Sequence, residues 1–384
     1  MKAKANTVLQ KTNSDVVFSI GGFHITVKML QKATPYFFIG PALLILFFTL
    51  IYPVFYGLGL SFFNWTLRDM ASAESPKLTS ASFDLLKKDG LPDNVLDQLD
   101  RFKNRKFRTK EKFLKKIEGA IGAEATARYQ KFLLKRTLKK PEFIGFGNYR
   151  ELAKSEFFWT SVGVTLKFSL SVVVFEILLG LFLALLLEEK MKGLRLFRTI
   201  FLLPIMIAPV VVGLIWRFLY DPSFGMINYF LSFLGIAPQT WLSDPSLALP
   251  AVVLADIWQW TPFVFLLLLA GLQGIPRSLL EAGEVDGTNY LQNLVYIKLP
   301  QIKSIIGITA ILRLIDSFRS LVVMFVMTEG GPGMSTEVLS LHLYKTAFTS
   351  QRLGLASAIA VVLIAIILSL AAVLMWSMRS PQEV

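Results

Sequence analysis

Six long stretches of the chain consist almost entirely of apolar residues, and polar segments separate them. A helix of roughly 20 mostly apolar residues crosses the hydrocarbon core of a bilayer, because its backbone polar groups are then bonded within the segment. The stretches predict spans at residues 36–63, 158–187, 199–220, 247–272, 304–327 and 353–378. The predicted fold class is an all-α polytopic membrane protein.

Basic residues in the polar segments predict the orientation of these spans. The N-terminal tail, residues 1–35, carries five lysines, and the loop after the second span carries four Lys or Arg. The loop at 221–246 carries none. Because Lys and Arg concentrate in cytoplasmic loops, both termini are expected in the cytoplasm.

The N-terminal tail contains one local signal. Val17-Phe-Ser-Ile and Phe23-His-Ile-Thr-Val alternate around Gly21-Gly22, which predicts a β-hairpin with a two-residue turn. An isolated hairpin is marginally stable in water, so it is expected to pack on another element.

The loop at 64–157 is an abrupt change of composition. Its part at 86–138 is rich in Lys, Arg, Leu, Phe and Glu, and its apolar residues recur at helical spacings, which predicts a basic helical insert. Much of the chain's net charge of +13 lies here. The basic run at 101–110 either attracts an acidic ligand or an acidic partner face, or is a solvated helical face. The extracytoplasmic position argues against nucleic acid.

The loop between the fourth and fifth spans, residues 273–303, predicts an elbow of two short helices. Pro276 suits the first turn of one helix, and Gly287 suits its left-handed end. Thr288 or Asn289 can cap the second helix, which Pro300 is expected to end.

This elbow resembles the signature of permease subunits of binding-protein-dependent ABC importers. The signature is EAA, three residues, Gly, nine residues and Ile-x-Leu-Pro, and it is matched by Glu281, Ala282, Gly287, Ile297, Leu299 and Pro300. Gly283 replaces the second Ala, which keeps the position small but weakens the helix by roughly 1 kcal/mol. The resemblance implies that these residues, with Gly283 and Asp286, contact a separate ATPase and transmit its closure to the spans.

Other segments resemble the carbohydrate-uptake branch of this family. They are 143–149, 204–228, the Gly330-Gly-Pro-Gly turn with Tyr344 and Phe348 after it, and the first span. The resemblance covers the whole chain except the N-terminal tail and the insert near 66–140.

The resemblance implies a fold, a location and partners. The fold is six transmembrane helices of the type I ABC importer permease with a helical extracytoplasmic insert, in a bacterial inner membrane, with a five-helix core at 158–384. The partners are a second permease subunit, a homodimer of ATP-binding subunits, an external binding protein, a sugar and the lipid bilayer. No phosphate-binding Gly-x-x-x-x-Gly-Lys-[Ser/Thr] loop occurs in the chain. The chain is thus expected to hold no cofactor and to be no enzyme, with ATP and magnesium bound by the ATPase.

Polar residues in the fourth span are candidates for a substrate pathway, because such groups in a membrane face protein interiors or aqueous paths. Asp256, Trp258, Gln259 and Trp260 combine hydrogen-bonding groups with aromatic rings, as sugars require. The two indoles are equally suited to the membrane interface or to packing.

Arg313, Asp316 and Arg319 recur every three residues in the fifth span. They share a helical face, so they are expected to pair among themselves. In the alternative interpretation, one of the arginines binds an anionic group of the substrate. Lys167 and Glu176 in the second span are expected to face the bundle. Prolines and a glycine in the third span predict kinks, either static or used in switching between inward-open and outward-open states.

Three alternatives remain open at this point. An ion-coupled transporter or channel would use Asp256, Asp316 or Glu176 for cations or protons. An importer of an acidic solute, such as a uronate oligomer or glycerol phosphate, would explain the basic insert and the membrane arginines. A membrane-anchored structural or sensory protein would leave the elbow signature unexplained.

Overall fold

The computed structural model describes residues 16–20, 23–66, 76–107, 109–137, 142–188 and 199–378. The chain divides into two units, Met1–Gly59 and Leu60–Val384. The predicted Gly21-Gly22 turn and the basic residues of the loop after the second span lie outside the described residues.

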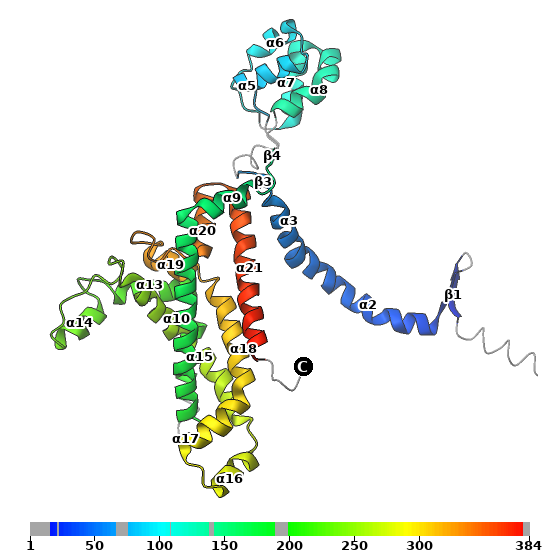
Figure 1. Ribbon diagram of the computed structural model, residues 1–384. Helices are drawn as coiled ribbons and strands as arrows, with labels where there is room; N and C mark the ends of the chain where they lie inside the picture. The colour runs from blue at the N-terminus through cyan, green and yellow to red at the C-terminus, as the bar shows by residue number, and fades with distance from the viewer. Residues whose placement is uncertain are drawn as a thin grey trace, which may run out of the picture. The chain divides into compact units, whose positions relative to one another are not determined.

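The first unit consists of a hairpin followed by a long apolar helix, coloured blue in Figure 1. Strands β1 (Val16–Ile20) and β2 (Phe23–Thr26) pair antiparallel, as the alternation predicts. Helices α2 (Val27–Leu46) and α3 (Tyr52–Leu60) are joined by a π-helical turn, η1 (Phe47–Ile51). The helical stretch Thr34–Leu60 is long and apolar enough to cross a membrane, and it covers most of the first predicted span at 36–63.

The second unit begins with a junction that brings the two ends of the insert together. Strand β3 (Phe63–Asn64) pairs antiparallel with β4 (Glu142–Phe143). Asn148 on α9 (Gly147–Lys154) donates to the carbonyls of Ser61 and Phe63 at 2.7 and 3.1 Å. The chain therefore leaves and re-enters the core at one place.

The insert is a helical subdomain with its own core, as the sequence predicts. Its helices are α5 (Ser80–Lys88), α6 (Asp93–Asp100), α7 (Lys110–Ile121) and α8 (Ala123–Thr137). Thr79 and Thr109 cap α5 and α7 by accepting from backbone N–H groups three residues on. The core contains Leu78, Leu86, Leu91, Val95, Leu96, Leu99, Phe102, Phe107, Phe113, Ile117 and Leu133.

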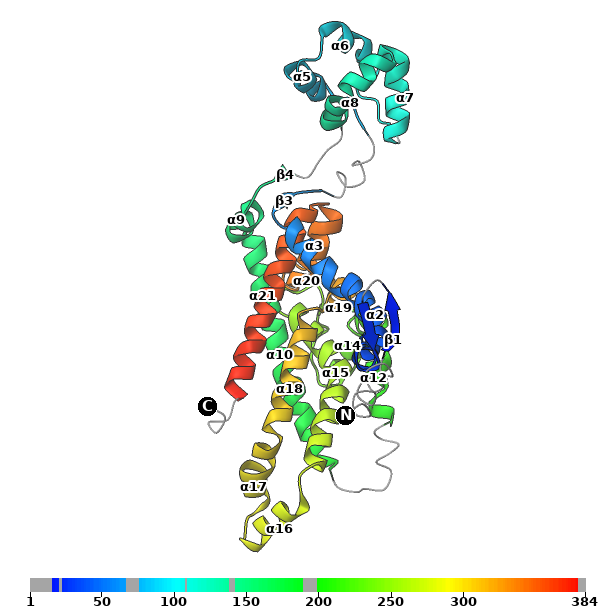
Figure 2. The same ribbon diagram turned by 90° about the vertical axis from the view of Figure 1, so that its right-hand side faces the viewer.

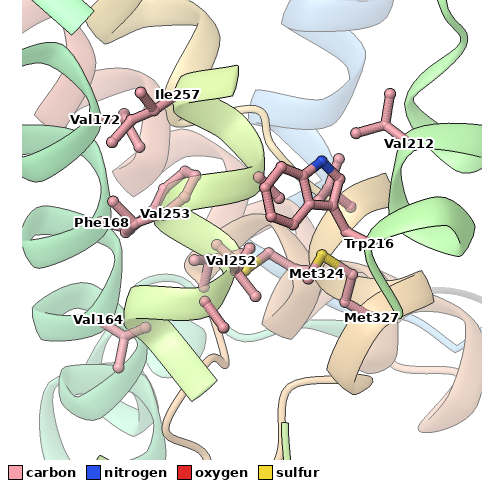
Figure 3. Packing of buried hydrophobic residues seen from close by; sticks show 14 of the residues in the cluster. Val164, Phe168, Val172, Val212, Trp216, Val252, Val253, Ile257, Met324 and Met327 are labelled. Carbon is pink, nitrogen blue, oxygen red and sulfur yellow. The ribbon is translucent and has the colours of Figure 1, made fainter. Parts of the chain in front are cut away.

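Four long helices form the frame of the remaining bundle. They are α10 (Glu156–Leu186), α15 (Ala248–Gln273), α18 (Leu299–Ser317) and α21 (Leu353–Met378), and they run alongside one another in Figure 2. Figure 3 shows how Phe168 and Val172 of α10 pack near Val253 and Ile257 of α15. The same core extends to Trp216 and to two methionines of α19 (Val322–Thr328).

The predicted third span at 199–220 is not a single helix. The chain forms α12 (Leu203–Met206), then an extended Ile207 and Ala208, and then α13 (Pro209–Leu219). Pro209 is the first residue of α13, because proline lacks the N–H that a continuous helix would require there. The 11-residue α13 is shorter than a full span. The short α14 (Met226–Phe233) follows it.

The predicted fifth span at 304–327 is displaced toward the N-terminus. A continuous apolar helix runs over Tyr290–Ser317, through α17 (Tyr290–Asn293), the π turn η2 (Leu294–Lys298) and α18. The helix stops at Ser317, and α19 begins anew at Val322. Beyond it lie α20 (Leu339–Tyr344) and η3 (Lys345–Thr349). The described residues thus contain five helices long enough to span, and α13 is a shorter apolar one.

Candidate functional site

The elbow is built by strong local signals. Helix α16 (Arg277–Val285) begins directly after Pro276, and Gly287 has φ +79°, the left-handed conformation predicted for its end. Asn289 caps α17 reciprocally, because its side chain accepts from the N–H of Gln292 and its own N–H donates to the Gln292 side chain, both at 2.9 Å. The expectation that Pro300 ends a helix is wrong: it lies in the first turn of α18, after the widened turn η2.

Close packing makes the elbow one rigid piece. Gly283 is buried, and a Cβ at this position would lie 2.6 Å from Ile297 Cδ1 and 3.1 Å from Thr288 Oγ1. A methyl group at this position would require the end of the Ile297 side chain to shift. Ile297 and Leu299 are half-buried, and Leu299 packs against the core cluster around Leu272.

The outer surface of the elbow is unusually apolar. Glu281, Ala282, Asp286 and Pro300 are exposed, and Val285 is 88% exposed. The other exposed large apolar residues here are Leu279, Tyr290, Leu291, Val295 and Tyr296. Exposed apolar side chains of this kind mark a contact with another protein or with lipid.

An ion pair that the sequence did not reveal ties the elbow to α10. The nearly buried Lys298 binds Glu188, which directly follows the end of α10. The Lys298 ammonium also lies 5.6 Å from the centre of the Tyr290 ring, a cation–π contact. A displacement of the elbow would therefore act on α10 as well as on α18.

A cluster of charges lies inside the bundle, where α10, α15 and α18 meet. Arg313 Nε and Nη2 donate to the two carboxylate oxygens of Glu176 at 2.6 and 2.8 Å. Nη2 also donates to Asp256 Oδ2 at 2.8 Å, and Nη1 donates to Asp316 Oδ2 at 2.7 Å. Arg313 and Glu176 are almost wholly buried, so these bonds form in a medium where they are strong and where losing a partner is costly.

The edge of this cluster is open. Arg313 lies 4.5 Å from the centre of the Trp260 ring, which is half-buried. The Asp316 side chain is 44% exposed. Arg319 is exposed and lies beyond the end of α18. It therefore does not join the ion pairs of Arg313 and Asp316, contrary to the expectation that these three residues pair among themselves. The expected pairing of Arg313 with Asp316 is confirmed.

The remaining candidates on α15 point elsewhere. The Gln259 side chain donates to the carbonyl of Ile207 at 3.1 Å, and so it holds the break between α12 and α13. Trp258 is 38% exposed, and its ring meets that of Trp216 edge-on with 5.9 Å between centres. Successive residues of a helix are about 100° apart, which explains why four polar and aromatic residues within one stretch of five divide between different neighbours.

Glu176 and Lys167, the two charged residues of α10 expected to face the bundle interior, differ in burial. Glu176 is buried there, and it is the member of the cluster whose partner the sequence could not indicate, because Arg313 lies 137 positions away. Lys167 is exposed in this chain, so its assignment to the bundle interior is wrong.

Two further ion pairs lie outside the spanning segments. Arg352 donates to both oxygens of Glu151 at 2.5 and 2.7 Å, and these bonds lower the pKa of the Glu151 carboxyl. Burial acts to raise the pKa of Glu337, but the nearby His342 and Lys345 side chains outweigh it, and the pKa is lowered. The Lys345 ammonium donates to Glu337 at 2.5 Å.

The bundle of long apolar helices, with a buried charge cluster and an elbow of two short helices, has the architecture of a multi-pass membrane protein. The family described as the inner membrane component of binding-protein-dependent transport systems matches residues 176–380, more than half of the chain. The chain belongs to this family. It is therefore an inner-membrane permease subunit of an ABC importer, a non-catalytic component.

Relatives with known names support the same family. The chain is 40% identical over 234 residues to the trehalose/maltose transport system permease protein MalF of Thermococcus litoralis, covering 60% of this chain and 78% of that protein. It is 35% identical over 232 residues to the sn-glycerol-3-phosphate transport system permease protein UgpA of Pectobacterium atrosepticum, covering 60% and 78%.

Among solved structures, the chain is similar to a chain of a bacterial ABC transporter involved in the import of the acidic polysaccharide alginate. The TM-score is 0.57 at 25% identity, and the match covers 68% of this chain and 94% of the other. The fold of the permease is thus shared over almost the whole of that chain.

Proposed function

We propose that this chain forms half of the translocation pathway of an importer for a sugar or oligosaccharide, driven by ATP hydrolysis on a separate subunit. The observation that carries the proposal is the elbow, which is rigid inside and apolar outside. A surface with an exposed Glu281 and a protruding Val285 suits insertion into a groove of another protein. Its linkage to α18 and, through Lys298, to α10 supplies a route for the motion.

The proposed topology has six transmembrane segments, with α12 and α13 together serving as the third. Both termini and the elbow at 273–303 lie in the cytoplasm, and the loop at 64–157 lies outside. Residues 1–35 form the cytoplasmic tail, 36–63 the first span and 158–384 the core.

The proposed assembly has four other components. A second permease completes the pathway, two identical ATP-binding subunits hold ATP and magnesium, and an external binding protein delivers the solute. Coupling to the ATP-binding subunits is assigned to Glu281, Ala282, Gly283, Asp286, Gly287, Ile297, Leu299 and Pro300. Gly283 and Ile297 act by keeping the elbow rigid, and the exposed members act by contact.

The substrate pathway is assigned to Asp256, Trp258, Gln259, Trp260, Arg313, Asp316 and Arg319. The contacts divide these residues by role. Asp256, Gln259 and Arg313 hold helices in place, whereas Trp260, Asp316 and the exposed Arg319 offer an aromatic face and hydrogen-bonding groups to a sugar.

An importer of an acidic solute is the second candidate, and the basic insert favours it. Relatives act on both classes, since one is named for trehalose and maltose and another for glycerol 3-phosphate. Arg313 is not an argument for an acidic solute, because its guanidinium is already paired with three carboxylates.

The test is uptake into proteoliposomes that contain this chain with its partner permease, ATPase and binding protein. Neutral and uronic oligosaccharides are compared, and Glu281→Lys is set beside Lys154→Glu, a charge reversal at an exposed position on α9, outside the elbow. ATP-dependent uptake that is lost only in Glu281→Lys supports the proposal. Uptake that needs neither ATP nor Glu281 overturns it in favour of an ion-coupled transporter.

A further inference from the structure

The helical insert carries a large open cleft whose lining is basic. The cleft has a volume of about 830 Å³ and is lined by Arg101, Phe102, Arg105, Lys106, Phe107, Lys112, Lys115, Lys116 and Gly119. Six of these nine residues are cations and none is acidic. We call this feature the basic cleft.

Most acidic residues of the insert precede the helix that lines the basic cleft, although Glu111 and Glu118 lie on that helix, α7. Residues 76–137 contain 16 Lys or Arg and eight Asp or Glu, a formal charge of +8 out of +13 for the chain. Five of the eight acids precede Arg101, on or beside α5 and α6. There Asp93 pairs with Lys87 and Asp100 with Lys103, whereas the six cations of the basic cleft form no ion pair with a described residue.

Helix α7 has two distinct faces. Phe113 and Ile117 are buried in the core of the insert, while Lys112, Lys115, Lys116 and Gly119 line the basic cleft at the i, i+3, i+4 and i+7 spacing of one helical face. Like charges at these spacings repel one another, and Lys112 in the first turn opposes the helix dipole, although Glu111 and Glu118 on the same helix offset part of both effects. An anion in the basic cleft would relieve both effects.

Aromatic rings lie beneath the cations. Phe102, Phe107 and Phe113 form a chain of edge-on contacts with ring centres 5.9 and 5.1 Å apart, and the first two line the basic cleft. The Arg101 guanidinium lies 5.1 Å from the centre of the Phe102 ring. Phe102 and Phe107 belong to the buried core and form the floor of the basic cleft, so a ligand would be recognised by the Lys and Arg groups, which bind carboxylates.

We propose that the basic cleft binds a linear oligosaccharide that carries carboxylate groups. The cleft is concave and of the size usual for ligand sites, which favours a chain of sugar rings over the flat face of a protein. The inference rests on the proposed function in one respect, the extracytoplasmic position of the insert. It names the acidic class of solute and a capture site separate from the pathway in the bundle.

The test measures binding of fluorescent tetragalacturonate to the full chain in nanodiscs of zwitterionic lipid, with labelled maltotetraose as the neutral probe. Lys112→Gln/Lys115→Gln/Lys116→Gln is compared with Lys87→Gln/Lys88→Gln/Lys131→Gln, a triple change that removes equal charge from exposed positions elsewhere on the insert. Arg105→Gln/Lys106→Gln is a second cleft variant, and helix content by circular dichroism checks that each variant folds.

Binding of the acidic probe is expected to weaken about tenfold in both cleft variants, to change less than about twofold in the control, and to weaken with added salt. An equal loss of affinity for the acidic probe in the cleft and control variants would show that binding depends only on net charge, and it would overturn the proposal. Equal binding of the neutral probe, or no binding of the acidic one at low salt, would also overturn it. No ATPase is present, so failure of ATP-driven uptake and failure of this binding are separate results.

Discussion

Arg313 and Glu176 form a two-pronged ion pair inside the bundle, with N–O distances of 2.6 and 2.8 Å, that joins α18 to α10. The same guanidinium binds Asp256 on α15 at 2.8 Å. Three helices therefore share one arginine. Such a buried pair adds little net stability compared with apolar packing, but removing one partner leaves the other charge buried without a counterion.

Arg313→Met should destabilise the purified chain by about 3–5 kcal/mol, because it leaves carboxylates buried without a cation. Glu176→Gln/Asp256→Asn/Arg313→Met should recover much of this loss, since it removes the buried charges together. Thermal unfolding in detergent compares the three proteins. A single variant as stable as the wild type would show that the cluster is not a structural clamp.

Gly283→Ala should weaken the elbow, because its Cβ would lie 2.6 Å from Ile297 Cδ1. The clash costs about 1–3 kcal/mol, and alanine's better helix propensity returns up to about 1 kcal/mol. Ile297→Val removes the opposing methyl group, so Gly283→Ala/Ile297→Val should restore ATP-driven uptake that Gly283→Ala reduces. If the double variant transports no better than the single one, Gly283 has a role other than packing.

The pair between Glu151 and Arg352 should make stability depend on pH in acid. Its hydrogen bonds lower the pKa of Glu151 from an ordinary value of 4.5, so the contribution is complete above that pH and is lost as the pH falls through the lowered value. Both side chains are partly exposed, which limits the contribution to less than about 1 kcal/mol. Unfolding of the wild type and Glu151→Gln should differ at pH 7 and converge in acid; a constant difference would contradict this.

Replacing residues 67–140 by a short Gly-Ser turn should leave the bundle folded. Phe63 and Phe143 already pair across the base of the insert, and Asn148 binds the carbonyls of Ser61 and Phe63. The melting temperature of the bundle should change by no more than a few degrees. Addition of Asn148→Ala to the shortened chain should lower it further, whereas a shortened chain that fails to fold would assign the insert a role in stability.

The sequence predicts the features that depend on near neighbours. The hairpin, the left-handed Gly287 and the pairing of Arg313 with Asp316 each follow from residues a few positions apart. The sequence does not predict the features that depend on contacts between distant segments. Glu176 and Asp256 reach Arg313 through helix packing, and Glu188 reaches Lys298 across 110 positions.

The two misplaced spans have a shared physical reason. The mean hydropathy stays high through Pro209, and across Ser317 it is interrupted only by a few polar residues, but hydropathy does not report where backbone hydrogen bonding is broken. Pro209 marks the first break, whereas Pro300 is accommodated by the π turn before it. The same residue type therefore has opposite effects at the two positions.

The most direct test of the central claim uses the absence of cysteine from the chain. Ala282→Cys places a single thiol on the exposed surface of the elbow, and Ser350→Cys places one at an exposed position far from it in sequence. The rate of maleimide modification is measured for the chain alone and for the complex with its partner permease and ATPase. Modification at 282 should slow at least about tenfold in the complex, because the elbow is covered, while modification at 350 stays the same. Equal rates at 282 in the two preparations would contradict the assignment of the elbow as the ATPase contact.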